Sequence, residues 1–207
     1  MKKLLCYLVL LTIFIPNQID AELITQKVID KSEIKYNRFS KNRFIAINKK
    51  LLDDLKDSST IKKLNRVNTW VNFIKYKKDI DVYNVVDYWA TLYEFVGKGV
   101  GDCEDYTIAK YYILKELGID PRRLKFTYVI YKTSKGEKVS HMVLAYLKKL
   151  KPKSKDDILI LDNTNKRLLP ASKRPNIVRV IKMINGDTGA KSKKWKKLER
   201  AMKRKKL

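Results

Sequence analysis

Apolar side chains recur three and four residues apart in the first half of the chain. This spacing predicts amphipathic helices over residues 44–55 and 61–74, separated by a Ser-Ser-Thr break. A further helix is expected over residues 103–117, where the same spacing continues until Gly118 provides a stop. Residues 22–43 are polar with weak periodicity, and we expect an extended or short helical lead-in there.

The second half of the chain alternates apolar and polar residues instead. This alternation predicts a strand over residues 124–130, with further strands at 139–147, 158–161 and 176–184. Helices first and strands afterwards indicate an α+β domain whose helices pack on an antiparallel sheet. Residues 87–96 fit either a short helix or an ordered loop.

The start of the chain has the pattern of an export signal. Lys2 and Lys3 precede an apolar run over residues 4–15, which is short for a bilayer span, and Ala21 offers a residue before a cleavage point. We therefore expect residues 1–21 to be a signal peptide, with an uncleaved anchor as the alternative.

Composition adds a strong positive charge. Lys and Arg outnumber Asp and Glu by 47 to 22, which gives a net charge of +25 over 207 residues. A chain of this length supports one sizeable core, which we assign to residues 22–190. The lysines are scattered except in the basic tail at residues 191–207, and this scatter together with export speaks against nucleic-acid binding.

The basic tail has a thin apolar stripe. Trp195, Leu198 and Met202 recur at helical spacing among many lysines. The simplest interpretation is a solvated, frayed helix. The alternative is a contact with an anionic membrane surface or an acidic partner.

Candidate chemistry centres on Cys103, which lies between glycines and acids at the expected start of a helix. Asp102 is a plausible N-cap and Asp105 lies near the N3 position. Free backbone N–H groups and the helix dipole at such an end favour a thiolate. After loss of residues 1–21, Cys103 is the one remaining cysteine, so it is either a buried inert thiol or a nucleophile. The surrounding glycines and acids favour the nucleophile.

A nucleophilic cysteine needs a base and a group that orients the base. His141, the single histidine of the chain, lies in an expected strand, and Asp162 closes the next one. A structural histidine and a turn-forming Asp-Asn pair are the simpler alternatives. The chain order of Cys on a helix, then His and Asp on successive strands, is shared by papain-like and transglutaminase-like sites.

The acids beside Cys103 suit a cation. Asp102, Glu104 and Asp105 offer hard oxygen ligands within one helical turn, as Ca²⁺ prefers. Helix capping and dipole compensation would account for one or two of them. Three bare carboxylates would raise the pKa of the thiol, and a bound cation would cancel that effect, so we expect a calcium site.

Three segments, residues 101–111, 141–144 and 161–163, resemble the bacterial transglutaminase-like cysteine proteinases, whose best-known members are the LapG-type periplasmic proteases. The resemblance covers roughly residues 60–185. An upstream stretch also resembles the family's Asp-x-Trp-x-Thr-Pro-x-Glu pattern, with Leu92 in place of the proline. Its matching residues are Asp87, Trp89, Thr91 and Glu94.

The resemblance implies a papain/transglutaminase-like fold in which a central helix carries the cysteine. It implies Cys103 as nucleophile, His141 as general base and then acid, and Asp162 as the group that holds the imidazole. The backbone N–H of Cys103 would be one oxyanion donor, and Trp89 is a candidate for the second by analogy with transglutaminases. Calcium would be needed for activity.

The resemblance also implies a cellular setting. It suggests a periplasmic endopeptidase that cleaves the N-terminal region of a large surface adhesin and thereby disperses biofilm. An inner-membrane receptor that senses cyclic di-GMP would control it. Two alternatives stay open: a transglutaminase or cell-wall peptide amidase with the same triad, and a non-enzymatic basic module that binds an anionic polymer.

Overall fold

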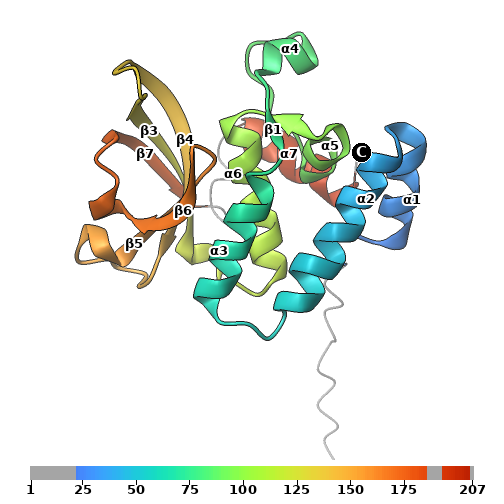
Figure 1. The fold of residues 1–207 in the computed structure, drawn as a ribbon, viewed down its shortest axis with the longest axis horizontal. Coiled ribbons are helices and arrows are strands. Elements are labelled where there is room, and N and C mark those ends of the chain that lie inside the picture. The colour runs from blue at the N-terminus through green and yellow to red at the C-terminus, as the bar shows by residue number, and fades with distance from the viewer. Residues whose placement is uncertain (1–21, 186–192, 206–207) are drawn as a thin grey trace, which may run out of the picture.

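The structure, a computed structural model, describes residues 22–185 and 193–205. Figure 1 shows a sheet on one side, α3 and α6 beside it, and α1 and α2 on the far side of these helices. The helices are α1 (Gln26–Lys35), α2 (Arg38–Ile47), the π-helical η1 (Asn48–Asp53), α3 (Thr60–Val71), α4 (Asp79–Tyr83), α5 (Leu92–Lys98), α6 (Cys103–Glu116) and α7 (Lys193–Lys203). Short 3-10 turns are η2 (Pro121–Arg123), η3 (Lys155–Asp157) and η4 (Ala171–Lys173).

The strands form two sheets. The strands are β1 (Lys75–Tyr76), β2 (Val100–Gly101), β3 (Leu124–Lys132), β4 (Lys138–Leu147), β5 (Ile158–Asp162), β6 (Asn165–Pro170) and β7 (Ile177–Asn185). The larger sheet has the order β6-β5-β4-β3-β7, and each neighbouring pair is antiparallel. The pair β1 and β2 is parallel and leads into α6. The expected α+β class with an antiparallel sheet is confirmed.

Polar caps begin the first three long helices. Thr25, Asn37 and Ser59 each accept a hydrogen bond from the backbone N–H three residues further on. Such side chains satisfy donors that have no partner within the helix, which fixes where each helix starts. The weakly periodic lead-in is therefore two ordered helices, α1 and α2, rather than an extended segment.

Helix α6 is the centre of the molecule. It packs against α3, α5 and β4. Its side chains Ile108, Ala109 and Ile113 are fully buried. A helix that is surrounded in this way is apolar on most sides. The contacts with α3, α5 and β4 hold α6 in place. Cys103 is the first residue of α6, at its N-terminus.

The C-terminal helix differs from the expectation. Trp195, Leu198 and Met202 are buried in the main core, and the Trp195 ring centroid lies 4.9 Å from that of Phe126 and 5.9 Å from that of Tyr111. The prediction of a solvated helix is wrong for α7, because its thin apolar stripe completes the core while its lysines face outward. Contact of those lysines with an anionic surface stays a prediction.

Two further expectations concern parts of the chain outside the fold just described. The signal peptide predicted at residues 1–21 and the first residues of the basic tail lie outside the described residues. Within the described ranges, no helix combines the length and apolar composition needed to span a bilayer.

Candidate active site

The turn before α6 depends on two glycines. Gly99 ends α5 with a φ of 69°, in the left-handed region that glycine adopts without strain. At Gly101 a Cβ atom would lie 2.5 Å from Asp105 Oδ2 and 2.6 Å from Phe95 Cδ2. The chain therefore approaches the first turn of α6 more closely than any side chain would permit. The sequence prediction of a helix start at Cys103 is confirmed.

Cys103 begins α6 with its thiol close to a carboxylate. Its Sγ donates a hydrogen bond to Glu104 Oε2 at 2.7 Å. Burial raises the pKa of the Cys103 thiol, and the charge and hydrogen bond of Glu104 raise it further, while the backbone of Met142 lowers it. These effects favour the thiol over the thiolate, as three neighbouring acids predict.

Cys103 also lies against the strand that carries the histidine. Thr107 Oγ1, one turn into α6, donates to the Cys103 carbonyl at 2.8 Å and to the Met142 carbonyl at 3.3 Å. Met142 follows His141 in β4. This link fixes the first turn of α6 against the segment of β4 that holds the imidazole.

His141 and Asp162 are in direct contact. His141 Nε2 lies 2.8 Å from Asp162 Oδ1, and the two side chains are 8% and 0% exposed. Strands β4 and β5 pair with Leu144 opposite Leu161, which brings both residues to the same end of the sheet. The pairing of base and orienter expected from the sequence is therefore present in the structure.

Asp162 stays ionised although it is buried. Burial raises its pKa, but hydrogen bonds and charges from His141 and Arg174 outweigh that effect and hold the pKa well below its usual range. Thr164 adds two donors, its backbone N–H and its hydroxyl, each at 2.9 Å. No local sequence pattern points to Arg174, because only the fold brings it to this carboxylate.

A cluster of acids lies next to the cysteine. Carboxylate oxygens of Asp79, Asp102 and Asp105 all lie within 4.8 Å of one another, and ligand atoms of Asp102, Cys103 and Glu104 form a second such group. The structure thus brings the three predicted ligands together around Asp102. It adds Asp79, which begins α4 and which sequence spacing could not reveal.

The negative charge of this cluster suits a cation that prefers hard oxygen ligands. Burial, followed by the charges of Glu104, Asp105 and Asp79, raises the pKa of Asp102 to about 9. Among the described side chains, Asp79 Oδ1 and Asp102 Oδ1 are buried and have no hydrogen-bond partner. Buried carboxylate oxygens without donors are costly, and a calcium ion would satisfy them, so the residues fit such an ion.

A family model of bacterial transglutaminase-like cysteine proteinases matches residues 32–203. The chain belongs to this family. The match extends on both sides beyond the segment that carries the motifs, and it includes α2 at one end and α7 at the other. Membership of this family makes the chain a cysteine peptidase.

Solved structures of LapG from Legionella pneumophila resemble this proteinase. The calcium-bound LapG structure aligns with a TM-score of 0.68 and 28% identity, covering 85% of this chain and 98% of LapG. A second LapG structure gives 0.67 and 31%, covering 87% and 96%, and EGTA-treated LapG gives 0.68 and 31% with the same coverage. Among curated protein sequences, none matches significantly.

A cleft of about 440 Å³ lies beside His141 in the proteinase. Apolar side chains form much of it, including Trp89, Tyr128 and Ile184, and Lys182 and Lys194 contribute positive charge. Trp89 therefore lies near the base, and its role as an oxyanion donor stays a prediction. An extended peptide with an apolar side chain would fit this lining.

The motif that contains Trp89 has a structural explanation. Thr91 and Glu94 form a capping box at the start of α5, in which each side chain accepts from the backbone of the other. Asp87 forms an ion pair with Lys194 of α7. The capping box fixes the end of the segment that carries Trp89, and the Asp87–Lys194 pair links this segment to α7.

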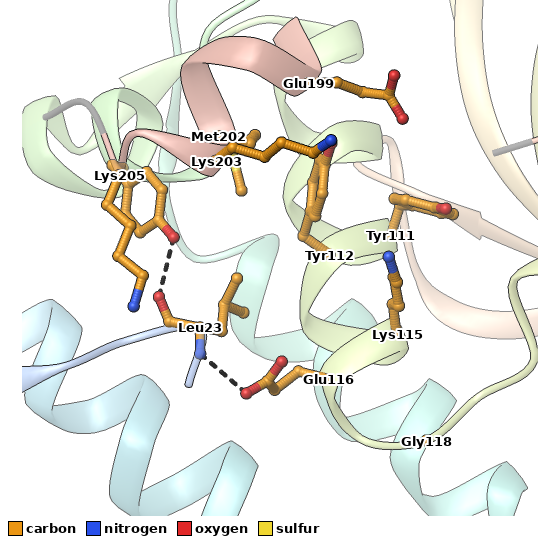
Figure 2. Close-up of a pocket in the computed structure, with 11 residues that line it drawn as sticks. Leu23, Tyr111, Tyr112, Lys115, Glu116, Gly118, Glu199, Met202, Lys203 and Lys205 are labelled. Atoms are coloured by element: carbon orange, nitrogen blue, oxygen red, sulfur yellow. Dashed lines mark hydrogen bonds between the residues drawn. The ribbon is translucent and has the colours of Figure 1, made fainter. Parts of the chain in front are cut away.

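A separate cavity of about 540 Å³ lies between α6, α7 and the start of the described chain (Figure 2). Its lining includes Tyr112, Glu116 and Met202 and none of the predicted site residues. Leu23 closes one side, since its N–H donates to Glu116 and its carbonyl accepts from Tyr93, both at 2.9 Å (Figure 2). This cavity is therefore separate from the predicted site residues.

Proposed function

We propose that this proteinase is a calcium-dependent cysteine endopeptidase that uses Cys103, His141 and Asp162. The observation that carries the proposal is the buried hydrogen bond of 2.8 Å between His141 and Asp162 beside the N-terminus of α6. Family membership supports the same reaction class. A nucleophile, a base and an orienting carboxylate are the three groups that peptide hydrolysis by a thiol requires.

The proposed proton positions follow from the hydrogen bond between His141 and Asp162. With Asp162 as an ionised acceptor, a neutral His141 ring would carry its proton on Nε2 and leave Nδ1 to accept. Nδ1 takes the proton of the Cys103 thiol as the sulphur attacks the substrate carbonyl. The imidazolium then returns this proton to the leaving amine as the C–N bond breaks. Water, deprotonated by the same nitrogen, cleaves the thioester and restores the thiol.

Backbone groups at the start of α6 would stabilise the oxyanion. The N–H of Cys103 belongs to the first turn of the helix and has no partner within it. Such a donor stabilises the charge that develops on the carbonyl oxygen. Trp89, in the lining of the adjacent cleft, is the proposed second donor.

The acid cluster is the proposed calcium site. Asp102, Glu104 and Asp105 would hold the ion, together with Asp79. The buried oxygens without donors support this assignment, as does the existence of calcium-bound LapG at 28% identity. The ion supplies positive charge that offsets the carboxylates around the thiol. The chain's own part is to present four carboxylates at one helix end.

The proposed setting follows the LapG resemblance. The substrate would be the N-terminal region of a large surface adhesin, whose release disperses biofilm. The chain would act in the periplasm after export through residues 1–21, under an inner-membrane receptor that senses cyclic di-GMP. The net charge of +25 is compatible with an acidic segment in the substrate or partner and does not require one.

The proposal is tested by incubating the protein with an adhesin N-terminal fragment and identifying new termini by mass spectrometry. We expect one discrete cut, and we expect Cys103→Ala and His141→Ala to abolish it while keeping the circular dichroism spectrum. The exposed control Glu137→Gln should cleave like the parent protein. Full cleavage by Cys103→Ala would contradict the proposal.

A second experiment distinguishes hydrolysis from acyl transfer to an amine. The parent protein is mixed with a glutamine donor and a labelled amine, and the label in protein is measured. Hydrolysis predicts no incorporation, because water resolves the thioester, whereas incorporation indicates a transglutaminase. Salt-dependent binding of an anionic polymer that survives Cys103→Ala, without any cleavage, would indicate a binding module instead.

A further inference from the structure

Arg174 is a buried arginine that directly contacts the proposed catalytic carboxylate. It follows η4, and its side chain is 1% exposed. Its Nη2 donates to Asp162 Oδ2 at 2.5 Å, and its Nε donates to Asn176 Oδ1 at 3.2 Å. The guanidinium is therefore held between the carboxylate and the start of β7.

The contacts of Asp162 divide between its two oxygens. Oδ1 accepts from His141 Nε2 at 2.8 Å and from the Thr164 N–H at 2.9 Å. Oδ2 accepts from Arg174 and from the Thr164 hydroxyl, at 2.5 and 2.9 Å. The Asp162 carbonyl accepts from Asn72 Nδ2 at 2.7 Å, which fixes the backbone as well. Each carboxylate oxygen has its own set of donors.

We infer that Arg174 is a positioning residue, which holds Asp162 so that Oδ1 faces His141 and keeps the imidazole proton on Nε2. This inference rests on the proposed function, in which Nδ1 must be free to take the thiol proton. An arginine suits the task because its guanidinium is always charged and donates in a rigid plane. Without it, Oδ2 would keep only the Thr164 hydroxyl, and the carboxylate could turn.

The burial of the pair strengthens the inference. Asp162 is 0% exposed on its side chain, so water cannot replace a lost donor without reorganisation. Breaking a buried pair from one side leaves a charge without compensation, and the group then protonates or moves. Either response removes the ionised acceptor that fixes the tautomer of His141.

The test exploits the fact that His141 is the single histidine of the chain. In protein labelled with ¹⁵N, the ring nitrogen signals of one residue report the tautomer directly. The parent protein should show the Nε2–H tautomer of the neutral ring. Arg174→Gln should give a mixture with Nδ1–H, and kcat for the adhesin fragment should fall about 10- to 100-fold, as for other supporting residues, with little change in KM.

Two further variants separate positioning from general loss of structure. Arg174→Lys keeps the charge but not the planar fork, so it should recover part of kcat and part of the Nε2–H signal. Arg123→Gln is the matched control, because Arg123 donates to the Tyr146 hydroxyl and the Lys148 carbonyl away from His141. It should change neither readout.

The tautomer and kcat measurements decide whether Arg174 positions Asp162. An Nδ1–H tautomer in the parent protein, or a folded Arg174→Gln protein with unchanged tautomer and kcat, would overturn it. If Arg174→Gln does not fold, Arg174→Lys is judged in its place, and parental values for both readouts count against positioning. The tautomer is measured without substrate, so a failure of the proposed peptidase activity is distinguishable from a failure of this inference.

Discussion

Cys103 lies in surroundings that oppose its ionisation. Burial and the adjacent Glu104 both raise the pKa of the thiol. A helix N-terminus favours the thiolate, but in this site desolvation and the neighbouring carboxylate have the larger effect. These surroundings therefore disfavour the thiolate, and compensation of the negative charge would favour it.

The raised pKa of the Cys103 thiol predicts how Glu104→Gln changes the ionisation of that thiol. With EGTA present, loss of the charge and replacement of the carboxylate by a weaker amide acceptor should lower the pKa of the Cys103 thiol. The pH dependence of alkylation by iodoacetamide, followed by mass spectrometry, should then shift to lower pH, because the thiolate is the reactive form. The exposed Glu137→Gln serves as control, and a curve for Glu104→Gln that coincides with the parent would contradict the account.

Asp162→Asn tests the orienting carboxylate. An amide at this position favours the wrong tautomer of His141, so kcat should fall by as much as about 10⁴-fold, the effect of the equivalent change in a serine protease triad. It also leaves Arg174 buried without its ion pair, which should cost roughly 3–5 kcal/mol of stability. Single-turnover rates and urea denaturation measure the two effects, with Asp156→Asn as an exposed control.

Sequence reasoning named three candidate catalytic residues and missed two side chains beside them. Cys103 and His141 stand out because His141 is the single histidine and the other cysteine lies in the predicted signal peptide. Asp79 and Arg174 have common residue types and lie in other elements, α4 and the segment after η4. Only the fold brings them to the site, so no local pattern could reveal them.

At the level of elements, α7 shows how composition misled the prediction. Its lysines dominate the sequence, yet three apolar side chains on one face are enough to bury the helix. By contrast, α6 was predicted from spacing alone, because its apolar positions and its glycine stop agree. Strand β6 was not predicted, since residues 165–170 mix polar residues and proline on an edge strand.

Burial of α7 predicts that Leu198→Ala destabilises the whole domain. Leu198 is 2% exposed, so the truncation leaves a cavity and should lower the free energy of unfolding by about 2–5 kcal/mol. Urea denaturation measures it. Lys196→Ala, on the exposed side of the same helix, should stay within about 0.5 kcal/mol of the parent. Equal stabilities for the two variants would mean that α7 does not complete the core.

At the level of the whole molecule, the core holds a fully buried amine. Burial lowers the pKa of Lys110 from 10.5 to about 7, although the charge of Asp162 opposes this effect. The unfolded chain therefore binds more protons than the folded one between these two pH values. The contribution of Lys110 to stability should improve as pH rises through this window.

Lys110→Met removes that contribution. The variant should be more stable than the parent below pH 7, and this advantage should shrink toward pH 10.5, where Lys110 is neutral in both states. Urea denaturation across the window measures the difference. Lys115→Met, exposed on the same helix, is the matched control. A difference that does not vary with pH would show that Lys110 keeps its charge in the fold.

The sequence indicated the class of the fold but not its arrangement. The spacing of the apolar residues and the order of the expected elements predict helices before an antiparallel sheet. Four of the five strands of the large sheet lie where the sequence predicts them. The strand order and the packing of α7 depend on contacts between distant segments. Contacts of the same kind bring Asp79 of α4 to the acids at the start of α6, and His141 of β4 to Asp162 of β5.

The central claim is that calcium controls a peptidase built on Cys103. The most direct measurement follows hydrolysis of an adhesin N-terminal fragment in one sample, first with calcium, then with excess EGTA, and then with calcium restored. The account predicts cleavage, arrest and recovery, with no cleavage at any stage by Cys103→Ala. Equal rates with calcium and with EGTA would contradict it.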